Sequence, residues 1–162
     1  MDFTEKHTFD KPVATVLKMF SDRSYFEKKY QALGYRNIEV LEHVTDARRF
    51  SIKVRYDASS STPLPDFARK FIGETNSVTQ TDSWDLDKRT GRLEAEIKGV
   101  PVKIRADMKL VSEGAGSCNA LRWTLSCGIP LLGGKLEQIV ARDIQARAGS
   151  DLARSREILK AY

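Results

Sequence analysis

The fold of this chain is decided by the stretch Ile129-Pro130-Leu131-Leu132-Gly133-Gly134, whose first four residues are expected to end an apolar strand, and by the long segment that follows it to Tyr162. In that segment apolar residues recur at every fourth position, which predicts a helix with one apolar face. The row consists of Leu136, Val140, Ile144, Ala148 and Leu152. Such a helix must pack against a large apolar surface, and the strands expected before it supply a sheet. A curved sheet wrapped around a helix encloses a space, so the sequence predicts a pocket.

The N-terminal part of the chain predicts one strand and two helices. Residues 2–9 alternate in polarity, which is typical of a strand. One face of this strand carries Phe3, Glu5, His7 and Phe9. Helical spacing follows over 13–20 and, after a break at Ser21-Asp22, over a second helix that ends near Leu33. Gly34 suits the left-handed residue just beyond that end.

Six further strands are expected between Arg36 and Ile129, because the apolar residues there recur with a period of two. The first of these strands carries Ile38, Val40 and Val44 on one face. The connections are short, which favours antiparallel neighbours. The faces expected to point inward carry Phe50, Ile52, Val54 and Tyr56; Leu93, Ala95 and Ile97; Val102, Ile104 and Met108; and Leu121, Trp123 and Leu125.

One connection, 57–75, is long and has an apolar segment of its own, with Leu64, Phe67, Phe71 and Ile72. The prolines before this segment and the glycine after it suit one or two helical turns. Long loops in compact domains are often functional. The segment is interpreted either as a cap that seals the end of the core or as a moving lid.

Composition bounds the class of protein. The 162 residues, 41% of them hydrophobic and 30% charged, are expected to form a single domain over 1–162. No apolar run approaches the roughly 20 residues that span a bilayer. The polar N-terminus shows no signal-peptide pattern, so a cytoplasmic location is expected.

No metal site and no cofactor are expected. Two cysteines and two histidines do not form a cluster at a recognisable ligand spacing. Gly128 and Gly133 are spaced as in a phosphate-binding loop, but Gly134 stands where the lysine belongs. The net charge of +5 is spread over strands and helices without interleaved aromatic residues, so no specific nucleic-acid binding is expected.

The order of elements, β-α-α-β6-α, resembles the helix-grip α+β fold of the START-like superfamily, also called SRPBCC. Two segments resemble its strand-to-helix opening and the start of its closing helix, namely 9–22 and 129–137. The segments Phe71-Ile72-Gly73-Glu74-Thr75 and Gln80-Thr81-Asp82-Ser83-Trp84 resemble an uncharacterised bacterial subfamily, a domain of unknown function. The resemblance covers essentially the whole chain.

This resemblance implies a deep, mostly apolar cavity between the curved antiparallel sheet and the closing helix. Members of the superfamily bind lipids, sterols, polyketides, quinones or plant hormones there, and some are cyclases or dehydratases. Because pocket chemistry varies on one fold, the fold does not settle function. The residues expected to contact a ligand are Phe50, Ile52, Tyr56, Phe67, Phe71, Gln80, Trp84, Ile104, Met108, Trp123, Leu136, Val140 and Ile144.

Polar residues on the inward faces are informative, because a buried polar group needs a partner. They are Glu5, His7, Asn76, Gln80 and Asp82. Glu5, His7 and Gln80 either orient a polar group of a ligand or satisfy neighbouring strands.

The expected function is binding, transport or sequestration of an apolar or amphipathic small molecule or lipid, with the loop around Phe67 and Phe71 controlling access. One alternative is a cyclase- or dehydratase-like enzyme in which Glu5 and His7 act as acid and base on a polyketide-type substrate. Another is a surface-binding module with a core filled by its own side chains. Residues 67–72 could also touch a membrane transiently, although the segment is too short to anchor there. The oligomeric state is left open.

Overall fold

The computed structural model describes residues 1–162, and its elements follow the expected order. They are β1 (Asp2–Phe9), α1 (Val13–Phe20), α2 (Arg23–Ala32), β2 (Arg36–Thr45), β3 (Arg49–Ser59), the 3-10 turn η1 (Ala68–Lys70), β4 (Thr75–Asp85), β5 (Thr90–Ile97), β6 (Lys103–Glu113), β7 (Gly116–Ser126) and α3 (Gly133–Leu159). The predicted order of one strand, two helices, six strands and a closing helix is confirmed. No helix is both long and apolar enough to cross a membrane.

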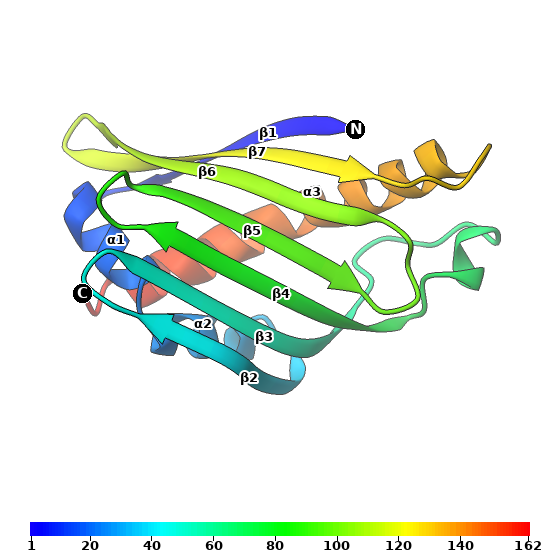
Figure 1. The fold of residues 1–162 in the computed structure, drawn as a ribbon, viewed down its shortest axis with the longest axis horizontal. Coiled ribbons are helices and arrows are strands. Elements are labelled where there is room, and N and C mark those ends of the chain that lie inside the picture. The colour runs from blue at the N-terminus through cyan, green and yellow to red at the C-terminus, as the bar shows by residue number, and fades with distance from the viewer.

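All seven strands form one antiparallel sheet in the order β1-β7-β6-β5-β4-β3-β2. The first strand joins the last one because residues 10–35 carry the chain across to the far edge, where β2 begins the meander. The sheet curves, and α3 runs across one of its faces with its C-terminal end beside α1 (Figure 1). This is the helix-grip α+β architecture, as predicted.

The helices are fixed by local contacts at their ends. Asp22 caps α2 by accepting a hydrogen bond from the backbone N–H of Ser24 at 2.9 Å. Gly34 follows α2 with φ = 78°, the left-handed conformation expected for it. At the far end of α3, the ammonium of Lys11 donates to the carbonyls of Leu159 and Tyr162 at 2.9 and 2.7 Å. The closing helix is therefore tied to the N-terminal part of the chain.

The stretch before α3 is a loop and not the end of a strand, so that detail of the prediction is wrong. β7 ends at Ser126, and Leu131 is 98% exposed with φ = 68°. Pro130 has no N–H to contribute to a strand ladder, and the chain must reverse here to reach α3. At Gly133 a Cβ would lie 2.4 Å from the carbonyl oxygen of Cys127, so only glycine fits where the helix begins.

Two further details differ from the sequence-based expectations. Val44 is 61% exposed, because the pairing of β2 with β3 shifts between Val40 and Glu42 and reverses the faces beyond that point. The loop between β3 and β4 forms the single 3-10 turn Ala68–Lys70, at the short end of the helical segment expected there.

Candidate functional site

A cavity of about 210 Å³ lies between the concave face of the sheet and α3. Of its 34 lining residues 22 are hydrophobic, so an apolar molecule inside would be removed from water on most sides. The apolar floor comes from β4 to β7 and the roof from Ile139, Val140, Ile144 and Ala148 on α3. This space lies beside a densely packed core of buried apolar residues.

Most of the residues expected to contact a ligand line this cavity. They are Tyr56, Gln80, Trp84, Ile104, Met108, Trp123, Val140 and Ile144. Glu5 and His7 also line it, from β1. Whether these residues contact a ligand remains a prediction.

Five of the expected residues lie outside the cavity lining. They are Phe50, Ile52, Phe67, Phe71 and Leu136. Phe50 faces inward as expected, but the ring of Phe26 on α2 stacks on it at 5.7 Å and covers it. Ile52 and Leu136 are completely buried in the packed core. From the long loop it is Leu64 and Ile72 that reach the cavity, whereas Phe67 and Phe71 pack against the outside of the core.

A buried charged cluster forms where α2, β4 and α3 meet. The ammonium of Lys29 lies 3.4 Å from a carboxylate oxygen of Asp151 and over the aromatic rings of its own helix, including Tyr25 at 5.1 Å. Burial lowers the pKa of Lys29, but Asp151, Tyr25 and Asp82 outweigh it and raise the pKa overall. Lys29 is therefore a buried cation with two carboxylates as counter-ions.

A hydrogen-bond chain leads from this cluster along the wall of the cavity. The hydroxyl of Tyr56 donates to Oε1 of Gln80 at 2.8 Å, and Nε2 of Gln80 donates to Oδ1 of Asp82 at 2.8 Å. Burial raises the pKa of Asp82 to about 6, although Lys29 and the Gln80 hydrogen bond act in the opposite direction. Gln80 thus has partners at both ends within the protein, which favours a positioning role for its side chain.

A second polar group, here called the β1–β7 polar cluster, consists of Glu5, His7, Asn119 and Trp123. The strand register places His7 opposite Asn119, and Glu5 lies between the pairs formed by Phe3 with Trp123 and by His7 with Asn119. Nε2 of His7 and Oε2 of Glu5 are 3.2 Å apart. Each of the four side chains has a buried polar atom without a hydrogen-bond partner in the protein. All four line the cavity.

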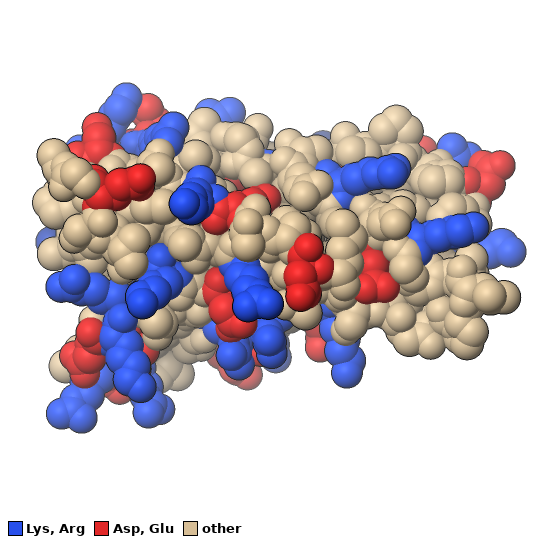
Figure 2. All heavy atoms as spheres, turned by 90° about the horizontal axis from the view of Figure 1, so that it is seen from above, with Lys and Arg blue, Asp and Glu red and all other residues tan.

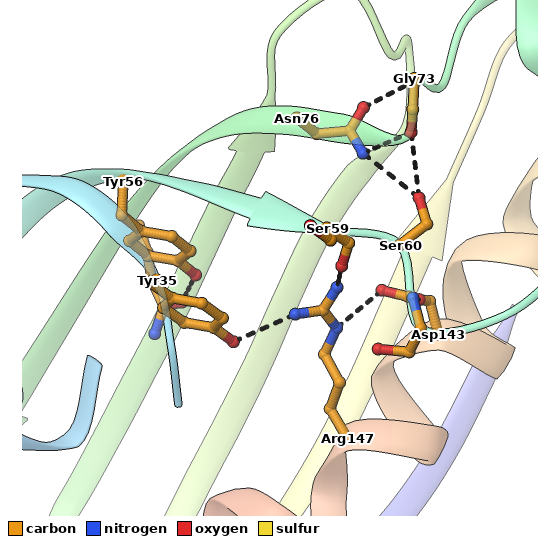
Figure 3. Close-up of polar contacts among 10 residues, drawn as sticks. Tyr35, Tyr56, Ser59, Ser60, Gly73, Asn76, Asp143 and Arg147 are labelled. Carbon is orange, nitrogen blue, oxygen red and sulfur yellow. Dashed lines mark hydrogen bonds and ion pairs between the residues drawn. The ribbon is translucent and has the colours of Figure 1, made fainter. Parts of the chain in front are cut away.

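The rim of the cavity is held together by Arg147 on α3 (Figure 3). Its guanidinium donates to Asp143 at 2.9 Å, to the hydroxyl of Tyr35 at 3.3 Å and to the carbonyl of Ser59 at the end of β3. The ring of Tyr35 stacks on Tyr56 at 4.4 Å. These bonds join α3 to the β3 end of the sheet.

The loop between β3 and β4 is fastened to the same rim. The backbone N–H of Ser61 donates to Asp143 at 2.5 Å. Where the loop joins β4, Nδ2 of Asn76 donates to the carbonyl of Gly73 at 2.9 Å (Figure 3). A molecule passing between this loop and α3 would have to break some of these contacts.

Sequence reasoning missed Lys29, Asn119, Arg147 and Asp151 as parts of the site. A signal existed for the first two. Lys29 shares a helical face with Tyr25 and Phe26, and Asn119 has the same strand parity as the inward-facing Leu121. No local signal shows that Arg147 and Asp151 reach inward, because that depends on how α3 lies on the sheet.

Charged side chains of both signs lie near one another on the visible surface. Figure 2 shows Lys and Arg side chains interspersed with Asp and Glu on the face seen from above. On the outside of the sheet, Arg92 and Arg105 lie 3.0 and 3.5 Å from Asp107. No group of three or more His, Cys, Asp or Glu side chains is arranged to hold a metal ion.

The sequence model of a family described as "Protein of unknown function (DUF2505)" matches residues 4–155. A comparison with curated proteins finds no match.

Solved structures with the same fold cover almost the whole chain. A protein from Thermus thermophilus, TTHA0849, has a TM-score of 0.68 at 19% identity and covers 99% of this chain and 98% of its own. Ara h 8.0201 has a TM-score of 0.68 at 15% identity and covers 100% and 99%. The Zhui aromatase/cyclase from Streptomyces sp. R1128 has a TM-score of 0.62 at 10% identity and covers 99% and 93%. At these identities the likeness shows the fold alone.

Proposed function

Since the chain belongs to the DUF2505 family, whose description states no activity, we propose from the geometry of its cavity that it binds an apolar or amphipathic small molecule there. The observation that carries this proposal is the cavity of about 210 Å³ with a mostly hydrophobic lining. A cavity of about 150 Å³ lined by apolar side chains can bind benzene, so this one has room for a bicyclic aromatic molecule or a body of similar size.

Burial of apolar surface would supply the affinity. A ligand that buries about 300 Å² of apolar surface gains on the order of 7 kcal/mol before the costs of ordering. Met108, Trp123, Val140 and Ile144 stand on opposite walls and would contact the two sides of the ligand. Access would run past the rim at Arg147, where hydrogen bonds hold α3 to β3 and the loop.

The first test is native mass spectrometry of freshly purified protein, followed by solvent extraction and identification of any released compound. A discrete adduct would name the chemical class of a ligand. Equilibrium dialysis against naphthalene then tests the cavity directly, because saturable uptake at one molecule per chain is expected.

A pair of variants on α3 locates the uptake. Ala148 lines the cavity and Ala153 is exposed on the same helix. Ala148→Trp is expected to block naphthalene uptake by filling the space, whereas Ala153→Trp should bind as the wild type does. Equal uptake by both variants, with circular dichroism showing both folded, would contradict binding in this cavity.

A second candidate function is catalysis on a polyketide-type carbonyl substrate, since a protein of the same fold is an aromatase/cyclase. The contact of 3.2 Å between His7 and Glu5, both facing the cavity, favours it. In this case the pair would transfer protons during ring closure or loss of water. His7→Ala should then abolish conversion of a linear poly-β-ketone thioester while changing naphthalene binding only modestly, and absence of any conversion by the wild-type protein would oppose the idea.

A further inference from the structure

Four buried polar atoms at one end of the cavity have no partner in the protein. They are Oε1 of Glu5, Nε2 of His7, Oδ1 of Asn119 and Nε1 of Trp123, the members of the β1–β7 polar cluster. Nε2 of His7 lies 3.2 Å from Oε2 of Glu5 but forms no hydrogen bond with it. Asn119 and Trp123 are only 4% and 8% exposed, so bulk water does not satisfy them. Since buried polar groups are almost always hydrogen-bonded in native proteins, such a concentration indicates a place for an outside partner.

The rest of the polar lining differs in this respect. Gln80, Tyr56 and Asp82 satisfy one another, and the hydroxyl of Tyr25 lies 2.8 Å from that of Ser155. The unpartnered groups are therefore gathered on β1 and β7 instead of being scattered around the cavity. These side chains lie close together because of the register between β1 and β7, in which directly opposite Cβ atoms lie about 5 Å apart.

The hydrogen-bonding character of the cluster is mixed. The indole of Trp123 can only donate, whereas the free oxygens of Glu5 and Asn119 accept. A hydroxyl group complements such a set, because its oxygen accepts one hydrogen bond and its hydrogen donates another. A carboxylate offers no donor, so it would leave the accepting oxygens unsatisfied.

The charges around the cavity also exclude an anionic head group. Lys29 is neutralised by Asp151 and Asp82, and Arg147 is engaged by Asp143 at 2.9 Å. No unengaged lysine or arginine lines the cavity, whereas Glu5 adds a carboxylate to the cluster. An anion entering this end would be desolvated beside a like charge, which is strongly unfavourable.

We propose that the β1–β7 polar cluster binds the uncharged, hydroxyl-bearing head group of an amphipathic ligand, a phenol or an alcohol, and discriminates against carboxylates such as fatty acids. The apolar body of the ligand then lies between Ile104 on the sheet and Val140 and Ile144 on α3. This inference rests on the proposed function, because it assigns a ligand class to the same cavity.

Three probes with one ring system test the proposal: naphthalene, 2-naphthol and 2-naphthoate, each measured by equilibrium dialysis. Two added hydrogen bonds predict that 2-naphthol binds about tenfold more tightly than naphthalene. The carboxylate 2-naphthoate should bind more weakly than naphthalene.

Variants assign the preference to named atoms. Trp123→Phe keeps a ring but removes the indole donor, and it should reduce the ratio of 2-naphthol to naphthalene affinity to about one third of its wild-type value or less. Glu5→Gln should raise the affinity for 2-naphthoate about tenfold, because it removes the like charge. Trp84→Phe is the matched control: its ring also lines the cavity but lies outside the cluster, so both affinities should change by the same factor.

Binding in the cavity and the role of the cluster can fail separately. If none of the three probes binds the wild-type protein, the proposed function itself is wrong. If naphthalene binds but 2-naphthol binds no more tightly, or if 2-naphthoate binds best, the assignment of a hydroxyl-bearing ligand is overturned. The proposal that the cavity binds an apolar molecule is kept in that case. A preference for 2-naphthol that survives unchanged in folded Trp123→Phe and Glu5→Gln would overturn the role of the cluster. Naphthalene affinity within each variant reports whether its cavity is intact.

Discussion

Replacing the carboxyl of Asp82 by an amide gives the sharpest test of the electrostatics inside the cavity. Asp82 is 6% exposed and belongs to the cluster with Lys29 and Asp151. Burial raises its pKa from 3.8 to about 6. The folded protein therefore holds this proton more tightly than the unfolded chain does, and the free energy of unfolding must depend on pH because of it.

The direction and size follow from that difference. Well below pH 3.8 the carboxyl is protonated in both states and carries no penalty. As the pH rises to about 6, the unfolded chain loses the proton first, so the contribution of Asp82 to stability falls and stays low above pH 6. The difference of about two pKa units corresponds to about 3 kcal/mol. Asp82→Asn removes this dependence, so its free energy of unfolding relative to the wild type should increase by about 2 kcal/mol between pH 4 and pH 7, which is most of the full difference.

The assay is urea unfolding followed by tryptophan fluorescence at several pH values, for the wild type and Asp82→Asn. The matched control is Asp66→Asn, at a carboxylate that is fully exposed, and its difference from the wild type should not change across this range. A difference between wild type and Asp82→Asn that is constant from pH 4 to 7, or that changes in the opposite direction, would refute the reasoning. The change with pH isolates the ionisation, because the altered hydrogen bond between the amide and Gln80 adds an offset at every pH.

Three other predictions use the same kinds of measurement. Lys29→Met should lower the free energy of unfolding at pH 7 by about 2–4 kcal/mol, because it leaves the buried carboxylate of Asp82 and the partly exposed one of Asp151 without their counter-ion. Lys28→Met, at an exposed position, should stay within about 0.5 kcal/mol. Equal effects of the two variants would contradict the buried ion cluster. Gly91→Ala should lower the free energy of unfolding by about 1–3 kcal/mol, since its Cβ would lie 2.7 Å from a carbon of the Trp84 indole. Gly149→Ala, on the exposed face of α3, places a Cβ that meets nothing within 4 Å and should raise the free energy of unfolding by up to about 1 kcal/mol, measured by thermal or urea unfolding. A loss at Gly149 as large as at Gly91 would show that packing does not explain the difference. Arg147→Met should raise the rate of naphthalene exchange about tenfold in stopped-flow experiments, because it removes charge-assisted hydrogen bonds across the rim. An unchanged rate would show that the ligand enters by another route.

Much of the fold could be predicted because its signals are local. The alternation in 2–9 and the fourth-residue row in 133–159 depend on residues close in sequence, and both elements form as expected. Val44 shows where such reasoning fails, because the register shift after Val40 reverses the faces of the strand. The alternation of apolar and polar residues does not predict that shift.

The site could be predicted only in part. Trp84, Met108 and Trp123 line the cavity as their strand parity indicates. Phe50 has the same inward parity, yet it is covered by Phe26 from α2. Parity states which side of the sheet a residue occupies, but it does not state whether a helix or a cavity lies over it.

The sequence by itself therefore determined the order of the elements and most of the faces that turn inward, because both follow from the spacing of apolar residues along the chain. Only the tertiary structure decided the chemistry of the cavity under the closing helix. Lys29 meets Asp151 through the packing of α2 on α3, and His7 meets Asn119 because β1 pairs with β7. Side chains more than a hundred residues apart become partners through the way the chain closes, and the spacing of residues along the sequence does not specify those pairs.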